Sequence, residues 1–176
     1  MIILLVVSDT HGRKAKLEET LKRQFAVDEK FRPTHIVHLG DGVEDMVNCS
    51  LCDRLCIHSV RGNCDSIFYT ISNTIPHERV IELAGDRIAI CHGHTFGVKS
   101  GEENAIEYAV SQNADMLMFG HTHVACSYTV KSGTVVNQTV VSKDLMVFNP
   151  GSLGYENSFG VVTLSESGIH TSIGKI

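Results

Sequence analysis

Residues 115–123 read DMLMFGHTH, an apolar run that is followed directly by a Gly-His-Thr-His turn. A short hydrophobic run bounded by polar residues is typical of a buried strand, so we expect a strand over 115–119. His121 and His123 then lie where the chain leaves the sheet, and neutral imidazole is a common ligand of divalent transition metals. The stretch therefore predicts part of a metal site at a strand end.

The same arrangement recurs at five further expected strand ends. The residues that follow these apolar runs are Asp9 and His11, Asp41, Asn63, His92 and His94, and Asn149-Pro150-Gly151-Ser152. In open α/β sheets, ligands bind beyond the carboxyl ends of the strands. Any single one of these residues is better explained as a turn former, a helix cap or an ordinary polar side chain than as a ligand. Their joint occurrence predicts a shared site, because so many ligand-bearing turns rarely gather at one sheet edge by accident.

The rest of the chain predicts an α/β protein whose second half is richer in strands. Apolar runs predict strands at 2–7, 35–39, 56–60, 79–84, 87–91 and 115–119, with a turn at Gly85-Asp86. Helical spacing of apolar residues predicts helices at 13–25, 43–55 and 102–112. No helix is expected after residue 112, where short strands are predicted at 124–130, 134–141, 145–148, 159–164 and 168–174. Two packed sheets, with helices outside the first half, fit this pattern.

Length and composition bound the class of protein. The 176 residues predict a single domain over 1–176. A net charge of -5 and the absence of Trp give no signal for nucleic-acid binding and no basic membrane patch. The apolar stretch 1–7 lacks a basic leader and is too short for a signal peptide or a membrane span. With six cysteines and no sign of secretion, we expect a cytoplasmic protein with reduced thiols.

Three of these cysteines allow two interpretations. Cys49, Cys52 and Cys56 fall at i, i+3 and i+7 within the expected helix. They are either three ligands of a structural zinc site or a helix face of small buried thiols. The buried-thiol interpretation is favoured, because zinc sites of this kind normally use paired Cys-x-x-Cys units.

The ligand inventory suits two ions better than one, because a single zinc takes only about four ligands. Asp41 is the natural shared carboxylate, since a glycine on each side lets the backbone approach the ions closely. Two ions about 3.5–4 Å apart clamp the attacking and leaving oxygens in phosphoryl transfer. They also outweigh the negative charge of Asp9 and Asp41, so the expected pocket is positive and favours a phosphate ester.

These residues, in this order, resemble the calcineurin-like metallophosphoesterases. The family pattern D-x-H, GD, GN, H-x-H and GHxH is matched in register over residues 8–152. The small size of the chain and its Gly-Asn-Cys-Asp sequence at 62–65 resemble the small bacterial and archaeal phosphodiesterase branch of YfcE type. The resemblance implies a four-layer α/β/β/α sandwich of two mixed sheets flanked by helices, and a homodimer is expected from relatives.

The resemblance also implies the metal ligands. The first ion is assigned Asp9, His11, Asp41 and His123, and the second Asp41, Asn63, His92 and His121. Catalytic roles are implied for Asn63 and for His94, which is placed beside the ions and faces the substrate phosphate. A hydroxide between the ions is expected to attack phosphorus in line. Manganese is the first expectation for the metal, with Fe, Ni, Co or Zn as alternatives, because the same imidazole, carboxylate and amide donors suit them all.

One position departs from the larger relatives, which carry a histidine after the asparagine. Here that residue is Cys64, a poor proton donor. Protonation of the leaving group is therefore expected from His94, or is dispensed with for good leaving groups. This predicts activity on phosphate diesters or activated esters and weak activity on alkyl monoesters.

The sequence supports less specific predictions for the roles of several neighbouring residues and segments. Arg61 is interpreted either as a contact to substrate phosphate or as a surface ion pair, and Asp65 as a turn cap. Residues 149–152 are expected to support the site without supplying a ligand. The stretches 66–78 and 95–101 lack a packing period and are predicted to select the substrate.

Three alternatives to a phosphodiesterase stay open. One is a phosphomonoesterase with the same metal centre. Another is a protein-binding scaffold, like the retromer subunit of this fold that has lost part of its metal set. The last is a redox or structural zinc protein that uses the cysteines. The enzyme is favoured because every motif position of this chain keeps a competent ligand.

Overall fold

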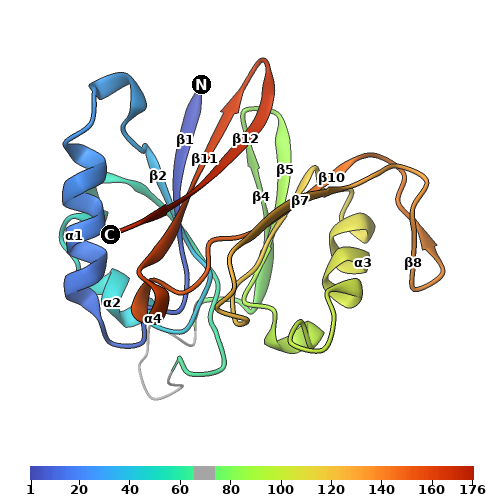
Figure 1. The fold of residues 1–176 in the computed structure, drawn as a ribbon, viewed down its shortest axis with the longest axis horizontal. Coiled ribbons are helices and arrows are strands. Elements are labelled where there is room, and N and C mark those ends of the chain that lie inside the picture. The colour runs from blue at the N-terminus through green and yellow to red at the C-terminus, as the bar shows by residue number, and fades with distance from the viewer. Residues whose placement is uncertain (66–73) are drawn as a thin grey trace.

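The computed structural model describes residues 1–65 and 74–176 and arranges them as two five-stranded sheets packed face to face. Helices cover the outer faces, which gives four layers in the order α/β/β/α (Figure 1). This is the sandwich that the resemblance implied. Within the described residues, no helix is both long and apolar enough to cross a membrane.

The first sheet has the strand order β12-β11-β1-β2-β3. Its strands are β1 (Ile2–Val7), β2 (His35–His38), β3 (Cys56–Ser59), β11 (Ser158–Ser165) and β12 (Gly168–Lys175). β1, β2 and β3 run parallel, whereas β11 and β12 are antiparallel to their neighbours. Helices α1 (Lys14–Phe25) and α2 (Val43–Val47) lie outside this sheet, at the left of Figure 1.

The second sheet has the order β4-β5-β6-β10-β7. Its strands are β4 (Glu78–Leu83), β5 (Asp86–Cys91), β6 (Met116–Met118), β7 (Cys126–Val130) and β10 (Leu145–Asn149). The three central strands are parallel and the two edge strands antiparallel. Helix α3 (Glu103–Ser111) covers the outer face, and the hairpin of β8 (Val135–Val136) and β9 (Thr139–Val140) projects beyond it at the right of Figure 1. The shorter elements are η1 (Glu29–Phe31), η2 (Cys52–Arg54), η4 (His94–Phe96) and α4 (Leu153–Glu156).

The middle strand of each sheet, β1 or β6, is apolar at every position because both of its faces are covered. Along β1, Leu4 and Val6 point into the core between the sheets, and Leu5 and Val7 point into the layer beneath α1 and α2. All four side chains are fully buried. Because these strands are held rigidly in the core, they fix the position of the loops that follow them, and these loops carry the predicted ligands.

The predicted helix over 43–55 is wrong. Helix α2 ends at Val47, and after Asn48 the chain makes turns and the short η2 before β3 begins at Cys56. Cys49 and Cys52 are buried as expected, but Cys56 is exposed on the edge strand. The three cysteines therefore share no helix face, and in the described part of the chain no group of potential metal ligands includes any of them.

Three smaller expectations also need correction. A helix does follow residue 112, namely the single turn α4, in which the side chain of Ser152 accepts a hydrogen bond from the backbone N–H of Tyr155. The expected strand 134–141 is instead the β8–β9 hairpin, which turns at Asn137 and Gln138 with positive φ angles. The turn between β4 and β5 lies one residue earlier than predicted, at Ala84 and Gly85.

Candidate metal centre

The predicted ligands lie on loops that are tied to one another in pairs. The loops after β1 and β2 are joined by the bonds from Asp9 N to Gly40 O and from His11 N to Asp41 O, at 2.9 and 3.0 Å. The loops after β5 and β6 are joined by the bond from Gly120 N to His92 O, at 3.1 Å. Each sheet therefore presents one paired set of ligand-bearing loops.

Most of these ligand residues have a strained backbone. Residues with a side chain seldom adopt positive φ, and such residues concentrate at functional sites. Five of the predicted ligands do so, with φ between 48° and 65°: Asp9, His11, Asp41, His121 and His123. The surrounding hydrogen bonds thus hold the loops in conformations that these side chains alone would disfavour.

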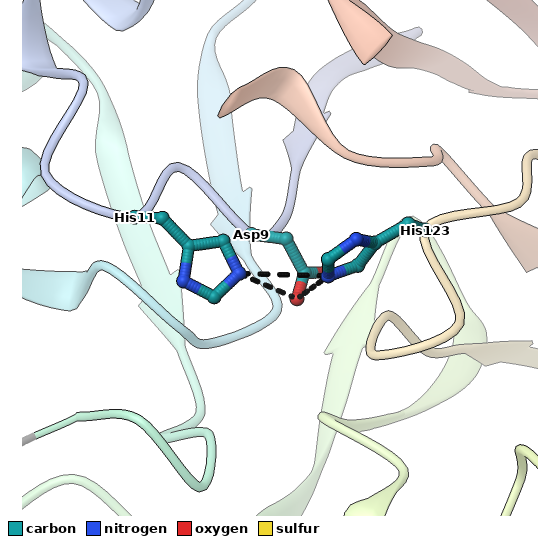
Figure 2. A group of neighbouring side chains, drawn as sticks. All are labelled: Asp9, His11 and His123. Carbon is teal, nitrogen blue, oxygen red and sulfur yellow. Dashed lines mark hydrogen bonds and ion pairs between the residues drawn. The ribbon is translucent and has the colours of Figure 1, made fainter. Parts of the chain in front are cut away.

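The first ligand group comprises Asp9, His11 and His123 (Figure 2). Asp9 Oδ1 lies 3.1 Å from His123 Nε2 and 3.6 Å from His11 Nε2, and these two nitrogens are 3.5 Å apart. The other carboxylate oxygen of the fully buried Asp9 accepts hydrogen bonds from Ser8 Oγ and His121 N. Oδ1 is therefore the oxygen that faces the converging imidazoles, as expected around a cation.

The second ligand group comprises Asp41, His92 and His121. His92 Nδ1 lies 2.7 Å from the carbonyl oxygen of Leu39, and only a protonated Nδ1 can donate to it. The unprotonated Nε2 then points to the carboxylates, 3.4 Å from Asp41 Oδ2, and is buried without a hydrogen-bond partner among the described residues. A histidine fixed by a carbonyl on one nitrogen and free on the other is typical of a metal ligand, so these residues fit a divalent cation.

The pKa values of the second group reflect its burial and its charges. Burial raises the pKa of Asp41, but the nearby His92 imidazole and the hydrogen bond from the N–H of Cys64 outweigh it and hold this pKa well below its usual range. Burial lowers the pKa of His92, but Asp41 and Asp9 more than reverse this and raise it. Burial and the nearby His92 lower the pKa of His121 to about 4, so its imidazole is neutral at pH 7 and has a lone pair for a metal.

The remaining predicted site residues lie around these two groups. Asn63 is exposed and lines a cavity of about 420 Å³ together with Asp41 and His121, and its amide lies 3.2 Å from Cys64 Sγ. The His94 ring is 5.3 Å from that of His92. Asn63 thus faces the cavity beside the ligand groups, and His94 lies next to His92 and His121 of the second group.

Among the described residues, Arg61 forms a hydrogen bond to a histidine and not the surface ion pair that was one of its two interpretations. Its Nε donates to His77 Nε2 at 3.0 Å, and the His77 ring lies 5.2 Å from that of His94. Arg61 and His77 therefore form a chain of contacts that ends at His94, and no sequence pattern predicts this chain.

Asp65 does more than cap a turn. Its Oδ1 accepts the backbone N–H groups of Gly42 and Val43 at 2.7 and 2.9 Å, and its Oδ2 accepts those of Asp41 and Gly62 at 2.9 and 2.7 Å. Gly42, the N-cap of α2, provides no side-chain cap of its own. Asp65 therefore caps α2 from a distance and fixes the turn that carries Asp41.

Residues 149–152 support the site as predicted. The Asn149 amide donates to Gly120 O and Thr122 Oγ1 at 3.1 and 3.0 Å, which fixes the Gly-His-Thr-His turn. Ser152 Oγ donates to the carbonyl oxygen of Asp9 at 2.9 Å. This loop thus joins the two ligand-bearing edges.

The cavity over the ligands also has residues that the sequence did not single out. Lys99, Tyr155 and Glu156 line its rim. Lys99 lies within the stretch 95–101 that was predicted to select the substrate, whereas residues 66–73 of the other predicted stretch lie outside the described residues. Tyr155 belongs to α4, a turn too short to leave a periodic signal.

Comparison with known proteins agrees with this geometry. A model of the calcineurin-like phosphoesterase superfamily domain matches residues 1–167. The probable metallophosphoesterase YsnB of Bacillus subtilis is 27% identical over 134 residues, which are 76% of this chain and 72% of that protein.

Solved structures share the fold at low sequence identity. A predicted phosphoesterase of Streptococcus pneumoniae aligns with a TM-score of 0.72 and 22% identity, covering 99% of this chain and 89% of its own. A protein described as a novel archaeal phosphodiesterase gives 0.63 and 19%, covering 98% and 100%. Vps29 of Entamoeba histolytica, crystallised with Zn²⁺, gives 0.65 and 18%, covering 99% and 98%. With a family model that spans nearly its full length, the chain belongs to the calcineurin-like phosphoesterase superfamily.

Proposed function

We propose that this protein is a dinuclear metal-dependent phosphodiesterase. The observation that supports this best is the position of Asp41 Oδ2, which lies 3.9 Å from His11 Nε2 and 3.4 Å from His92 Nε2. These imidazoles belong to different ligand groups. A carboxylate oxygen that faces both groups is in the position expected of a ligand shared by two cations.

The proposed ligands divide as the family pattern implies. The first ion would be held by Asp9, His11, Asp41 and His123, and the second by Asp41, Asn63, His92 and His121. When bound, the ions supply Lewis-acid activation of water and neutralise charge on the phosphate. The chain orients the donors and leaves a cavity of about 420 Å³ for a small ester. Manganese is our first choice, and Fe, Co, Ni and Zn suit the same donors.

His94 is proposed as the residue that contacts the phosphate or the leaving oxygen. Burial, followed by the nearby His92 and His77, lowers its pKa, so the ring is neutral at pH 7 and offers an N–H donor rather than a cation. Burial and Asp41 raise the pKa of Cys64 to about 11, which makes this thiol a poor acid. Weak proton donors favour diesters and activated esters over alkyl monoesters.

The metal dependence and the preference for diesters are tested together. Purified protein loaded with Mn²⁺ is expected to hold two ions per chain and to hydrolyse bis-nitrophenyl phosphate faster than nitrophenyl phosphate. Asp41→Asn, which weakens the shared ligand, is expected to lose both metal and activity. Wild-type protein that neither binds Mn²⁺ nor hydrolyses either ester would contradict the proposal and favour a protein-binding role.

The role of His94 is tested with two diesters that differ in their leaving group. His94→Ala is expected to lower kcat about 100-fold for an alkyl diester, and less for a nitrophenyl diester that needs no protonation. His170→Ala, at an exposed position on β12, is the matched control. Unchanged turnover of both diesters by His94→Ala would exclude His94 as the donor.

We also propose a reducing, cytoplasmic location. All six cysteines lie within the described residues and are free thiols. Structural disulfides are rare in reducing compartments, so this state supports the proposal. Fractionation of the native cells, with detection of the protein in the cytoplasmic fraction, is the measurement that checks it.

A further inference from the structure

We propose that Tyr155 is a positioning residue for the first ligand group, Asp9, His11 and His123; this inference rests on the proposed metal-dependent function. The Tyr155 ring stacks on that of His123, with centroids 5.3 Å apart and planes 20° apart. It also meets the His11 ring at 5.1 Å and 55°. One aromatic side chain thus contacts both imidazoles of the group, although they come from different sheets.

Arg13 contacts both the Tyr155 ring and the backbone of His11. Its guanidinium carbon lies 4.3 Å from the centroid of the Tyr155 ring, a distance typical of a cation–π contact. Its Nη1 donates to the carbonyl oxygen of His11 at 3.3 Å. Arg13 therefore holds the Tyr155 ring and the backbone of His11 at the same time.

The backbone of α4 fixes the ring relative to Asp9. The Asp9 carbonyl oxygen accepts hydrogen bonds from Ser152 Oγ and Gly154 N at 2.9 and 3.0 Å, and Ser152 Oγ accepts one from Tyr155 N. A Cβ atom at Gly154 would lie 2.7 Å from the same carbonyl oxygen, so this close approach requires glycine. The residue that supplies the carboxylate thus also anchors the helix that carries Tyr155.

The ring, rather than the hydroxyl, carries this role. Tyr155 is 53% exposed, and within the described chain its hydroxyl makes no hydrogen bond. Outer residues that orient metal ligands typically change metal affinity 10- to 100-fold when they are replaced. Loss of the ring should therefore weaken the first site, whereas loss of the hydroxyl should have no effect.

The test measures metal binding without substrate, so a ring that served only to contact substrate would give no change. Mn²⁺ is titrated into metal-free protein, with electron paramagnetic resonance to distinguish a coupled pair of ions from a single one. Tyr155→Leu is expected to weaken one of the two sites by about 10- to 100-fold and to shift the spectrum towards single ions. Tyr155→Phe is expected to retain wild-type affinity, as is Tyr128→Leu, a tyrosine control on β7.

The outcomes separate this inference from the proposed function. Wild-type protein that binds no Mn²⁺ would overturn both. Two wild-type affinities in Tyr155→Leu would overturn this inference alone, as would a loss of affinity in Tyr155→Phe as large as that in Tyr155→Leu. If Tyr155→Leu does not fold, Arg13→Gln replaces it: a weaker first site supports the inference, and unchanged affinity overturns it.

Discussion

The carboxylate of Asp65 holds the backbone on which Asp41 is mounted. Its sequence position after Gly-Asn-Cys predicts only a turn cap, because nothing local indicates that Asp65 bonds to a turn more than twenty residues earlier. The convergence of the six side chains in the two ligand groups could be predicted, since each follows an apolar run and the ends of parallel strands meet at one edge. Residues that support ligands through long-range contacts, such as Asp65 and Tyr155, left no comparable pattern.

Replacing Asp65 by asparagine should destabilise the protein. The amide oxygen of Asn can accept from two of the four backbone N–H groups, but its NH₂ group would face the other two. Leaving buried donors unsatisfied costs about 1–3 kcal/mol each, so two of them should lower the free energy of unfolding by about 2–6 kcal/mol. Urea denaturation in the presence of a chelator measures this. A smaller change is expected in the control Asp144→Asn, at an exposed turn, and an equal change in both would contradict the role of Asp65.

His92 should give the metal-free protein a characteristic dependence on pH. Its pKa in the folded state is raised above the ordinary 6.5, so protonation favours the folded state. The stabilisation is complete below pH 6.5 and is lost as the pH rises through the higher folded value. His92→Gln lacks it, so the stability advantage of the chelated wild type over this variant should shrink as the pH rises above 6.5 and through the raised pKa of the folded state. An advantage that grows with pH would contradict the assignment.

At the scale of elements, the strands were the most predictable part of the fold. Strands such as β1 and β6 are buried on both faces. Their sequences are therefore continuous apolar runs, which are easily recognised. Two of the errors, at α4 and at the β8–β9 hairpin, concern elements that are not defined by burial. Helix α4 depends on a Ser152 cap and on hydrogen bonds to Asp9, and the β8–β9 hairpin on two residues with positive φ.

The turn between β4 and β5 offers a test of local strain. Ala84 and Gly85 both have positive φ, 54° and 93°, as in the mirror-image turns that suit two-residue hairpins. Alanine is strained in this conformation, so Ala84→Gly is expected to raise the free energy of unfolding by about 0.5–1 kcal/mol. Thermal or urea denaturation checks it. Ala89→Gly, at a buried position on β5, should change stability in the opposite direction, and destabilisation by Ala84→Gly would show that the turn is unstrained.

At the scale of the whole molecule, each ligand group joins the two sheets. Asp9, His11 and Asp41 follow strands of the first sheet, and His92, His121 and His123 follow strands of the second. An ion bound by either group therefore connects both halves of the sandwich. Its binding free energy should stabilise the fold as a unit.

Metal removal should accordingly lower the thermal stability of the whole chain in one transition. A ligand present at 100 times its Kd stabilises the native state by about 2.7 kcal/mol, which corresponds to about 5–10 °C in Tm for a chain of this size. Calorimetry with Mn²⁺ and then with a chelator measures the shift, with Mg²⁺ as a comparison of weaker affinity for imidazole. A separate early transition for one sheet would contradict the coupling.

Five of the proposed ligand residues have a left-handed backbone conformation, and this affects which substitutions would be favourable at their positions. Each such residue costs the fold about 1 kcal/mol that glycine would largely avoid. Glycine at these turns would therefore relieve backbone strain, but it would also remove the capacity to hold an ion and, at Asp9 and Asp41, the hydrogen bonds that the carboxylates accept. The chain thus keeps ion-binding side chains at turns where the backbone alone would favour glycine, as is common at functional sites.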